Sequence, residues 1–219
     1  MGRLQKDLEV LLATVGNVSH GQIPRARVID IPSRHMNGVV RDVYRKLGGA
    51  VDVPVIRLGN WDVEFDGVAV ELDEQLHFNK YRALTLRSRA YENLPGFPLE
   101  DYQSFCRERQ HECMRAGRYL GKWTNPTSAL QFGPPAPFDD LSGGGAPRWK
   151  QRAFYDFVKD TLPLVSGVRV ARLSIWDLIR DNGKERMVAD VLRHPGKKSA
   201  RALANLVEHR GKSGIRRAR

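Results

Sequence analysis

The sequence predicts an α/β domain in which helices pack on a central sheet. Helical periodicity appears at 3–15 and again from about residue 37, and three β-rich segments follow one another between residues 53 and 73. A further helix and strand are predicted at 148–161 and 168–173. This alternation of helices and strands is typical of α/β domains. At 219 residues with 41% hydrophobic residues, the chain can build one sizeable core.

The first helix is expected over residues 3–15 because its apolar residues recur on one face. Residues 16–36 contain Pro24 and Pro32 and are expected to form a loop. A second helix is predicted from about Asn37, whose side chain can cap a helix N-terminus, to the glycine pair at 48–49.

Three short strands are expected next, at 53–59 (VPVIRLG), 60–65 (NWDVEF) and 68–73 (VAVELD). The following segment, 74–94, has the composition and periodicity of a long helix, and 99–120 is predicted to form another. A run rich in Pro and Gly then indicates an exposed loop before the helix predicted at 148–161. One or two helices are expected after the strand at 168–173.

We interpret residues 1–210 as one domain. Its core is expected to comprise about 37–90 and 148–195, with a helical and loop insertion at about 91–147. Residues 211–219 are basic and almost free of apolar side chains, which predicts a C-terminal tail.

The formal net charge of +11 and a pI near 10 point to a polyanionic partner. Residues 180–219 alone hold twelve Lys or Arg against four Asp or Glu. No apolar run approaches the roughly 20 residues of a membrane helix, and no helix pairs the basic charge with a large apolar face. We therefore expect a cytoplasmic protein that binds nucleic acid, DNA rather than RNA, and not a membrane. Cys106 and Cys113 cannot make a disulfide framework and are expected to be buried thiols.

The Asp66-Gly67 dipeptide lies between two strand segments and predicts a two-residue hairpin turn. In that register the numbers of facing residues sum to 133. One face then pairs Trp61, Val63 and Phe65 with apolar partners, and the other face is acidic. The acidic face carries Asp62 opposite Glu71, with Glu64 and Asp73 beside them.

Facing carboxylates repel one another across a hairpin and destabilise it, so the predicted pair of Asp62 and Glu71 needs an explanation other than stability. One interpretation is an oxygen-ligand site for a hard divalent cation, Mg²⁺ or Mn²⁺. The other is an ordinary polar face turned toward solvent. Glu64 is an alternative to Asp62 as the first acid, because it lies on the same face.

The segments 61–65 (WDVEF) and 70–73 (VELD), followed by His77, resemble the restriction-endonuclease-like PD-(D/E)xK superfamily. They are most similar to the branch related to very-short-patch repair endonucleases. The resemblance covers about residues 39–86. It implies an αβββαβ core with a central mixed sheet, Mg²⁺ held by acids, and hydrolysis of DNA phosphodiester bonds. Asp73 stands where the superfamily has the lysine of its E-x-K motif.

The resemblance implies Asp62, Glu71 and Asp73 as metal ligands. On the predicted helix, His77 would orient or deprotonate the attacking water and Lys80 would stabilise charge on the phosphate. Backbone phosphates are expected to meet a set of basic side chains: Arg82, Arg87, Lys197, Lys198, Arg216 and Arg217.

Two other functions remain open from the sequence alone. Because the E-x-K lysine is absent, the chain could be a non-catalytic nucleic-acid-binding protein that keeps a decayed nuclease fold. Paired carboxylates also occur in retaining carbohydrate-active enzymes, although the high positive charge argues against that class.

Overall fold

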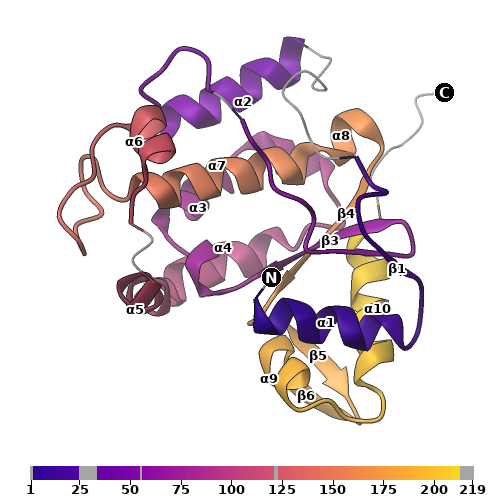
Figure 1. The fold of residues 1–219 in the computed structure, drawn as a ribbon. Helices are drawn as coiled ribbons and strands as arrows, with labels where there is room; N and C mark the ends of the chain where they lie inside the picture. The colour runs from indigo at the N-terminus through magenta and orange to yellow at the C-terminus, as the bar shows by residue number, and fades with distance from the viewer. Residues whose placement is uncertain (1, 25–33, 55, 121–122, 213–219) are drawn as a thin grey trace.

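In a computed structural model of the chain, residues 2–24, 34–54, 56–120 and 123–212 are described. A four-stranded mixed sheet lies at the centre, flanked by helices, as the sequence predicts (Figure 1). The strands follow chain order across the sheet, with the first three antiparallel and the last pair parallel. They are β1 (Val18–Ser19), β2 (Val63–Phe65), β3 (Val68–Asp73) and β4 (Arg169–Ser174).

The predicted hairpin and its register are confirmed from Val63 to Val70. The predicted facing of Asp62 and Glu71 is not part of this pairing, because Asp62 precedes β2 and its backbone N–H donates to the carbonyl of Val70 at 3.1 Å. Val63 faces Val70, Glu64 faces Ala69, and Phe65 faces Val68. Asp66 and Gly67 both have positive φ, 46° and 74°, as a type I′ turn requires. This turn matches the right-handed twist of the strands, which explains why so short a sequence signal sets the pairing.

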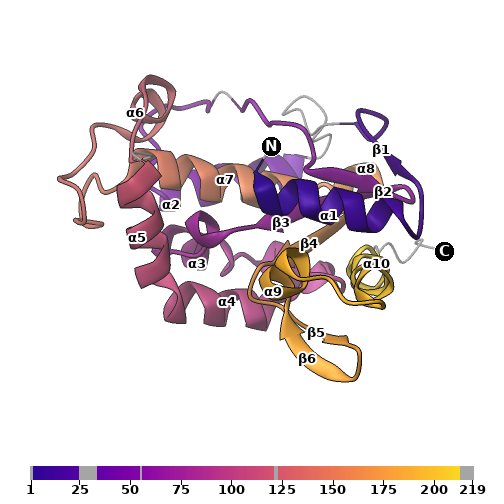
Figure 2. The same cartoon turned by 60° about the horizontal axis from the view of Figure 1, so that its bottom comes forward.

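One face of the sheet packs against three helices from the two ends of the chain (Figure 2). These are α1 (Arg3–Ala13), α9 (Val188–Arg193) and α10 (Ser199–Arg210). Leu4, Leu8 and Leu12 of α1 lie at helical spacing and are buried there against the apolar face of the hairpin. Trp61 is an exception to the predicted face, because it belongs to the hydrophobic cluster on the opposite side.

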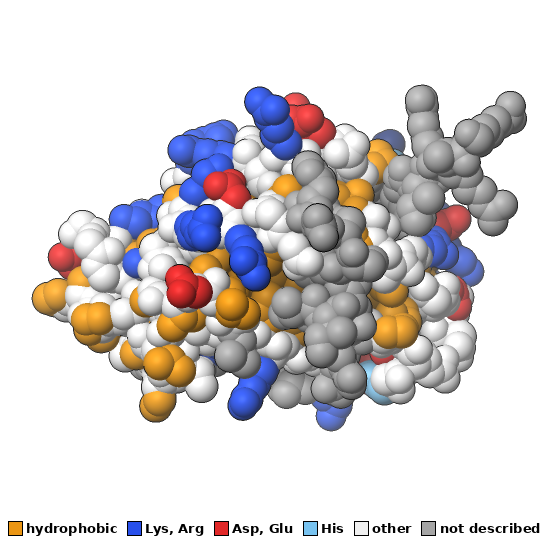
Figure 3. Space-filling view, turned by 90° about the horizontal axis from the view of Figure 1, so that it is seen from above, with side chains coloured by type: hydrophobic (Ala, Val, Ile, Leu, Met, Phe, Trp, Pro, Cys, Tyr) orange, Lys and Arg blue, Asp and Glu red, His pale blue; other side chains and the backbone are white. Residues whose placement is uncertain are grey.

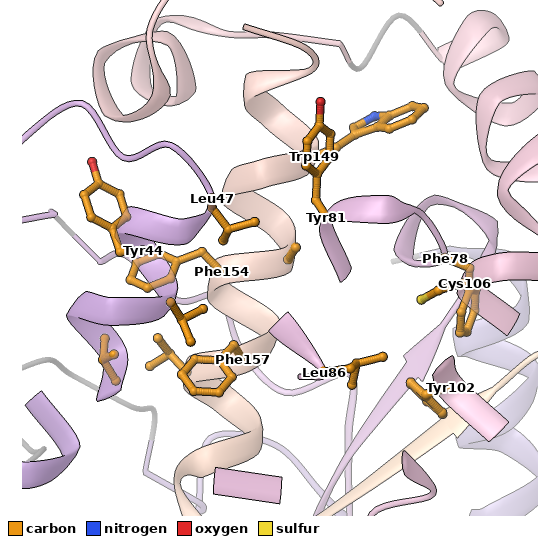
Figure 4. Close-up of a cluster of buried hydrophobic side chains, with 14 of the residues drawn as sticks. Tyr44, Leu47, Phe78, Tyr81, Leu86, Tyr102, Cys106, Trp149, Phe154 and Phe157 are labelled. Carbon is orange, nitrogen blue, oxygen red and sulfur yellow. The ribbon is translucent and has the colours of Figure 1, made fainter. Parts of the chain in front are cut away.

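Helix α7 (Pro147–Thr161) covers the other side of the sheet, and most of its residues are buried. It is followed directly by the short α8 (Pro163–Ser166). Aromatic side chains of α7, including Trp149, Phe154 and Phe157, pack among residues of the neighbouring helices (Figure 4). Those neighbours are α2 (Arg34–Lys46), α3 (Lys80–Thr85) and α6 (Pro126–Phe132).

Three elements differ from the sequence prediction. The described residues of 53–59 form no strand, because β1 pairs with β2 along the edge that this segment was expected to occupy. The helix expected at 74–94 is divided into η2 (Gln75–His77), α3 and η3 (Arg89–Asn93). Asn79 causes the second start, since its side chain accepts hydrogen bonds from the backbone N–H groups of Tyr81 and Arg82.

The helix expected at 99–120 is likewise two helices, α4 (Leu99–Glu108) and α5 (Gln110–Leu120), so Cys106 and Cys113 lie on different helices. Both cysteines are buried and free, as expected. The chain closes with a hairpin that the sequence analysis missed, formed by β5 (Leu178–Asp181) and β6 (Lys184–Met187). Among the described residues, no helix combines the length and the apolar character needed to cross a membrane.

Candidate functional site

The acidic face of the hairpin is covered by α7 and does not face solvent. Glu64, Glu71 and Asp73 are buried, and Asp62 is partly buried at the start of β2. The interpretation as a solvated polar face is therefore wrong. Carboxylates buried in this way must be compensated by cations or hydrogen bonds, and the structure provides both.

Lys159 of α7 is the cation that meets the predicted acid pair. Its Nζ lies 2.5 Å from Oε1 of Glu71 and also donates to the carbonyl of Asn60 at 3.1 Å. The ammonium group lies 5.1 Å from the centre of the Trp61 ring. Burial raises the pKa of Glu71 to about 7, with Lys159 opposing the shift and the nearby Asp62 adding to it.

Asp62 lies between this buried pair and the surface. Its Oδ2 accepts a hydrogen bond from the backbone N–H of Leu72 at 2.8 Å, and burial raises its pKa. Asp62 also lines a pocket of about 240 Å³. The pocket is enclosed by Gln5, His20, Gly21, Ile23, Asn60, Trp61, Asp62 and Glu64.

Glu64, the alternative first acid, has a different set of partners. Its carboxylate accepts hydrogen bonds from the backbone N–H groups of Gly21, Gln22 and Ile23 and from the hydroxyl of Ser19. These four donors engage both oxygens and hold the segment after β1 against β2. Asp62 is therefore the better placed of the two to act on a ligand.

Arg172 of β4 lies at the centre of the remaining acids. It faces Glu71 across the parallel β3–β4 pair, and its Nη1 lies 2.6 Å from Oδ1 of Asp73. Its other nitrogens contact two acids of α7, with Nε 2.7 Å from Asp160 and Nη2 3.2 Å from Asp156. These carboxylates raise the pKa of Arg172 well above its usual value.

Arg82 does not reach a nucleic-acid surface, which corrects the expectation from sequence. It is fully buried, and its Nη2 lies 2.7 Å from Oδ2 of Asp160. The same oxygen accepts a hydrogen bond from the hydroxyl of Tyr91 at 2.7 Å. A buried, paired guanidinium of this kind stabilises the interior and cannot contact a phosphate.

Asp73, His77 and Asp156 form a second group that could hold a metal ion. One ligand atom from each lies within 4.8 Å of the others. The His77 Nδ1 is 3.0 Å from Oδ1 of Asp73 and 2.8 Å from Oδ2 of Asp156. His77 and Arg172 hold the pKa of Asp156 well below its usual range, against the effect of burial.

Asp73 is nevertheless occupied by protein partners. Its Oδ1 meets Arg172 and His77, and its Oδ2 accepts a hydrogen bond from the hydroxyl of Tyr102 at 2.9 Å. Glu71 is likewise paired, with Lys159 at 2.5 Å and with Arg172 at 3.8 Å, so Asp62, which lines the pocket, is the one of the three acids without a cation in direct contact among the described residues. Asp73 orders the cluster around Arg172.

The structure does not bring Lys80 to these acids. His77 ends the 3-10 turn η2, whereas Lys80 begins α3 and is exposed, with its Nζ 5.5 Å from the centre of the Tyr81 ring. The two residues do not share one helical face, as was expected. Arg87, Lys197 and Lys198 are exposed, and Arg216 and Arg217 lie outside the described residues.

Four residues of the cluster were missed from sequence: Asp156, Lys159, Asp160 and Arg172. A signal for the first three was present, because they recur at helical spacing among the apolar residues of α7. Arg172 likewise interrupts the apolar strand β4. Charged residues inside otherwise buried elements usually have charged partners, which is what the structure provides.

A search of the curated proteins and a search of the solved structures each found no match. A family model described as a family of unknown function (DUF7255) matches residues 42–194. The matched region contains β2, β3, α7 and β4, and with them the whole acid and base cluster. Since the match covers more than half of the chain, the protein belongs to the DUF7255 family.

Proposed function

We propose that this protein hydrolyses phosphodiester bonds of DNA with the help of Mg²⁺ or Mn²⁺. The observation that carries the proposal is the group formed by Asp62, Glu71 and Lys159. Asp62 directly precedes β2, Glu71 lies within the neighbouring β3 and close enough to Asp62 to raise the pKa of Glu71, and a lysine contacts Glu71 at 2.5 Å. This is the combination of two acids and one lysine that the PD-(D/E)xK resemblance implies, with the lysine supplied by α7 and not by β3.

The order of elements around this group also supports the proposal. The elements α1, β1, β2, β3, α7 and β4 follow one another as helix, three strands, helix and strand, with the remaining helices inserted between them. That order corresponds to the αβββαβ core of the superfamily. The first acid lies at the start of the second strand and the second acid lies within the third.

The donor set suits a hard divalent cation. Asp62 and Glu71 offer carboxylate oxygens, and each has its pKa raised by burial, so each gains from a further positive charge nearby. When bound, Mg²⁺ would polarise the phosphate and lower the pKa of a water molecule.

The protein's own residues would position the reaction. Asp62 faces the pocket and Glu71 lies behind it, 5% exposed, so the two would hold the ion at the inner end of the pocket. Lys159, fixed by Glu71 and the carbonyl of Asn60, would place a positive charge beside the phosphate. The basic surface would attract the polyanion.

The test is cleavage of supercoiled plasmid, duplex DNA, single-stranded DNA and RNA, each with Mg²⁺ and with Mn²⁺. Asp62→Asn and Glu71→Gln are expected to abolish cleavage while DNA binding persists. Asp66→Asn is the matched control, because it makes the same chemical change at the turn of the same hairpin and should retain cleavage. Wild-type protein that binds DNA but cuts none of these substrates would favour the non-catalytic binding function.

A further inference from the structure

A second pocket, of about 340 Å³, lies between α2, α3, α7 and the loop before α7. It is separate from the acid cluster and is lined by basic and apolar residues. These are Lys46, Leu47, Gly48, Lys80, Tyr81, Leu84, Arg87, Leu141, Gly143 and Lys150. Figure 3 shows Lys and Arg side chains gathered on the neighbouring face of the molecule, the one that carries α2.

Three of the four cations that line this pocket lack an acidic partner. Lys46 pairs with Asp42 at 2.7 Å. Within the described parts of the chain, no carboxylate lies within ion-pair distance of Lys80, Arg87 or Lys150. Asp140, beside Leu141, interacts with Lys80 at longer range, so cations outnumber acids around this concave surface. Such an excess of positive charge attracts anions.

Lys150 makes this arrangement unusual, because its side chain is enclosed. The residue is only 6% exposed, and its Nζ has one weak hydrogen bond, to the carbonyl of Gly143 at 3.4 Å. Lys150 and Lys80 lie 5.6 Å and 5.5 Å from the centre of the same Tyr81 ring. Burial, and then the charge of Lys80, lowers the pKa of Lys150. An anion in the pocket would relieve this repulsion.

The wall of the pocket is held in place by Tyr81. Its hydroxyl donates to the carbonyl of Leu141 at 2.9 Å and accepts from the backbone N–H of Ala146 at 3.1 Å. Gly145 has a φ of +56°, and a Cβ there would lie 1.8 Å from the Tyr81 hydroxyl oxygen, so only glycine is accommodated. The glycine-rich loop is therefore a packed wall and not a loose connection.

We propose that this pocket binds a phosphoryl group. The anion would lie among Lys80, Arg87 and Lys150, whose ammonium and guanidinium groups are donors suited to phosphate oxygens. The ligand would be a phosphate monoester or diester. The phosphate would belong either to a nucleic-acid backbone or to a free nucleotide.

The location allows the pocket to cooperate with the acid cluster without belonging to it. Lys150 and Lys159 lie on the same helix, nine residues apart, which corresponds to about 13 Å along its axis and about two and a half turns, so their side chains leave opposite sides of α7. Nucleic acid held at both places would have to pass around α7 and would span several nucleotides. The inference rests on the proposed nuclease function only if the phosphate belongs to a nucleic-acid backbone. Binding of a free nucleotide does not require cleavage.

The experiment measures binding of inorganic phosphate, deoxyadenosine monophosphate and oligothymidylate by calorimetry at low salt. Arg87→Gln should weaken phosphate binding about tenfold by removing one charge-assisted hydrogen bond. Arg89→Gln is the matched control, because Arg89 is equally exposed, lies two residues further on, and does not line the pocket. Lys150→Met keeps the length of the enclosed side chain and should abolish binding.

The probes distinguish the two sources. Competition between oligothymidylate and phosphate, with both weakened by Arg87→Gln, would identify a backbone phosphate as the ligand. Binding of the mononucleotide without competition by oligothymidylate would identify a free phosphoryl ligand. Wild-type protein that binds phosphate no better than Arg87→Gln, or an equal loss in Arg89→Gln, would overturn the proposal. Asp62→Asn should leave phosphate binding unchanged, which separates this test from that of the nuclease function.

Discussion

Lys159 on α7 and Glu71 on β3 form a buried ion pair with 2.5 Å between Nζ and Oε1, although 88 positions separate them in the chain. The pair fastens the helix to the sheet at the point where Asp62 faces the pocket. Lys159 stabilises the ionised form of Glu71, and in the proposed function it would also supply a charge beside the phosphate. The two roles can be separated by experiment.

Lys159→Met is expected to reduce single-turnover DNA cleavage about a hundredfold or more, as loss of one preorganised charge does in other enzymes. Lys159→Arg should recover part of that rate, since the positive charge is kept at a slightly different place. The comparison is made on protein shown to be folded by circular dichroism. Equal loss in both variants together with unchanged metal affinity would point to a packing role alone.

The stability of the metal-free protein should fall as pH rises from about 4.5 to about 7. Glu71 has a pKa of about 7 in the folded state against 4.5 in an ordinary environment, so the folded protein holds this proton more tightly. The stability it contributes is therefore complete below pH 4.5 and lost as pH passes through 7. The shift corresponds to on the order of 3 kcal/mol.

Urea unfolding of wild-type protein and Glu71→Gln at both ends of this pH range measures the effect. Glutamine cannot ionise, so the difference between the two proteins should grow as pH rises. Mg²⁺ should restore part of the wild-type stability above pH 7, because the ion binds the carboxylate form. A difference that does not change with pH would show that Glu71 is ionised throughout.

The turn and the adjoining register of the hairpin could be predicted because they depend on residues close together in the chain, whereas Trp61 and Asp62, before β2, depart from the prediction. Asp66 and Gly67 accept positive φ, and the alternating side chains on either side then set the register from Val63 to Val70. The predicted facing of Asp62 and Glu71 lies outside it, because the backbone N–H of Asp62 donates to the carbonyl of Val70. The strand that pairs with the other edge of β2 comes from a segment far from β2 in the chain, and more than one segment could have formed it. Val18 and Ser19 occupy that edge, while the described residues of the more apolar run at 53–59 do not, and strand propensity alone could not decide between the two segments.

The bases of the site could not be placed from sequence for the same reason. Arg172 faces Glu71 only because β4 returns parallel to β3 after the long helical insertion, and Lys159 faces it only because α7 crosses that side of the sheet. The E-x-K lysine was sought next to Glu71 in the chain. In the proposed function its counterpart would be Lys159, which contacts Glu71 from α7.

Glu64→Gln is expected to destabilise the protein by about 1–3 kcal/mol, because the charged acceptor of several backbone N–H groups is lost. Cleavage by the folded fraction should persist, in contrast to Asp62→Asn. Thermal unfolding and cleavage measured on the same samples check both parts. Loss of cleavage without loss of stability would make Glu64 the first acid in place of Asp62.

Removal of residues 213–219 takes away Arg216, Arg217 and Arg219. The truncation begins there because the carbonyl of Gly211 accepts a hydrogen bond from Arg169 and belongs to the folded part. If the three arginines contact phosphates, the slope of log affinity against log salt should decrease by about 0.9 for each contact on duplex DNA. An unchanged slope would show that the tail makes no phosphate contact.

Arg172→Met tests what holds the acid cluster together. The substitution leaves Asp73, Asp156 and Asp160 without their shared cation, and breaking such a buried pair costs about 3–5 kcal/mol. Arg169→Met on the same strand is the matched control, because Arg169 is less buried and donates only to the carbonyl of Gly211, so its cost should be smaller.

The same variant also tests whether Asp73, His77 and Asp156 can hold a metal ion. With Arg172 gone, the carboxylates beside His77 lose the guanidinium that they contact directly, and a divalent ion can supply that charge. Mn²⁺ or Mg²⁺ should therefore raise the melting temperature of Arg172→Met by more than that of the wild type. Arg172→Met combined with His77→Ala should lose this extra stabilisation. Equal metal effects in the wild type and both variants would mean that Asp73, His77 and Asp156 serve the fold and hold no ion.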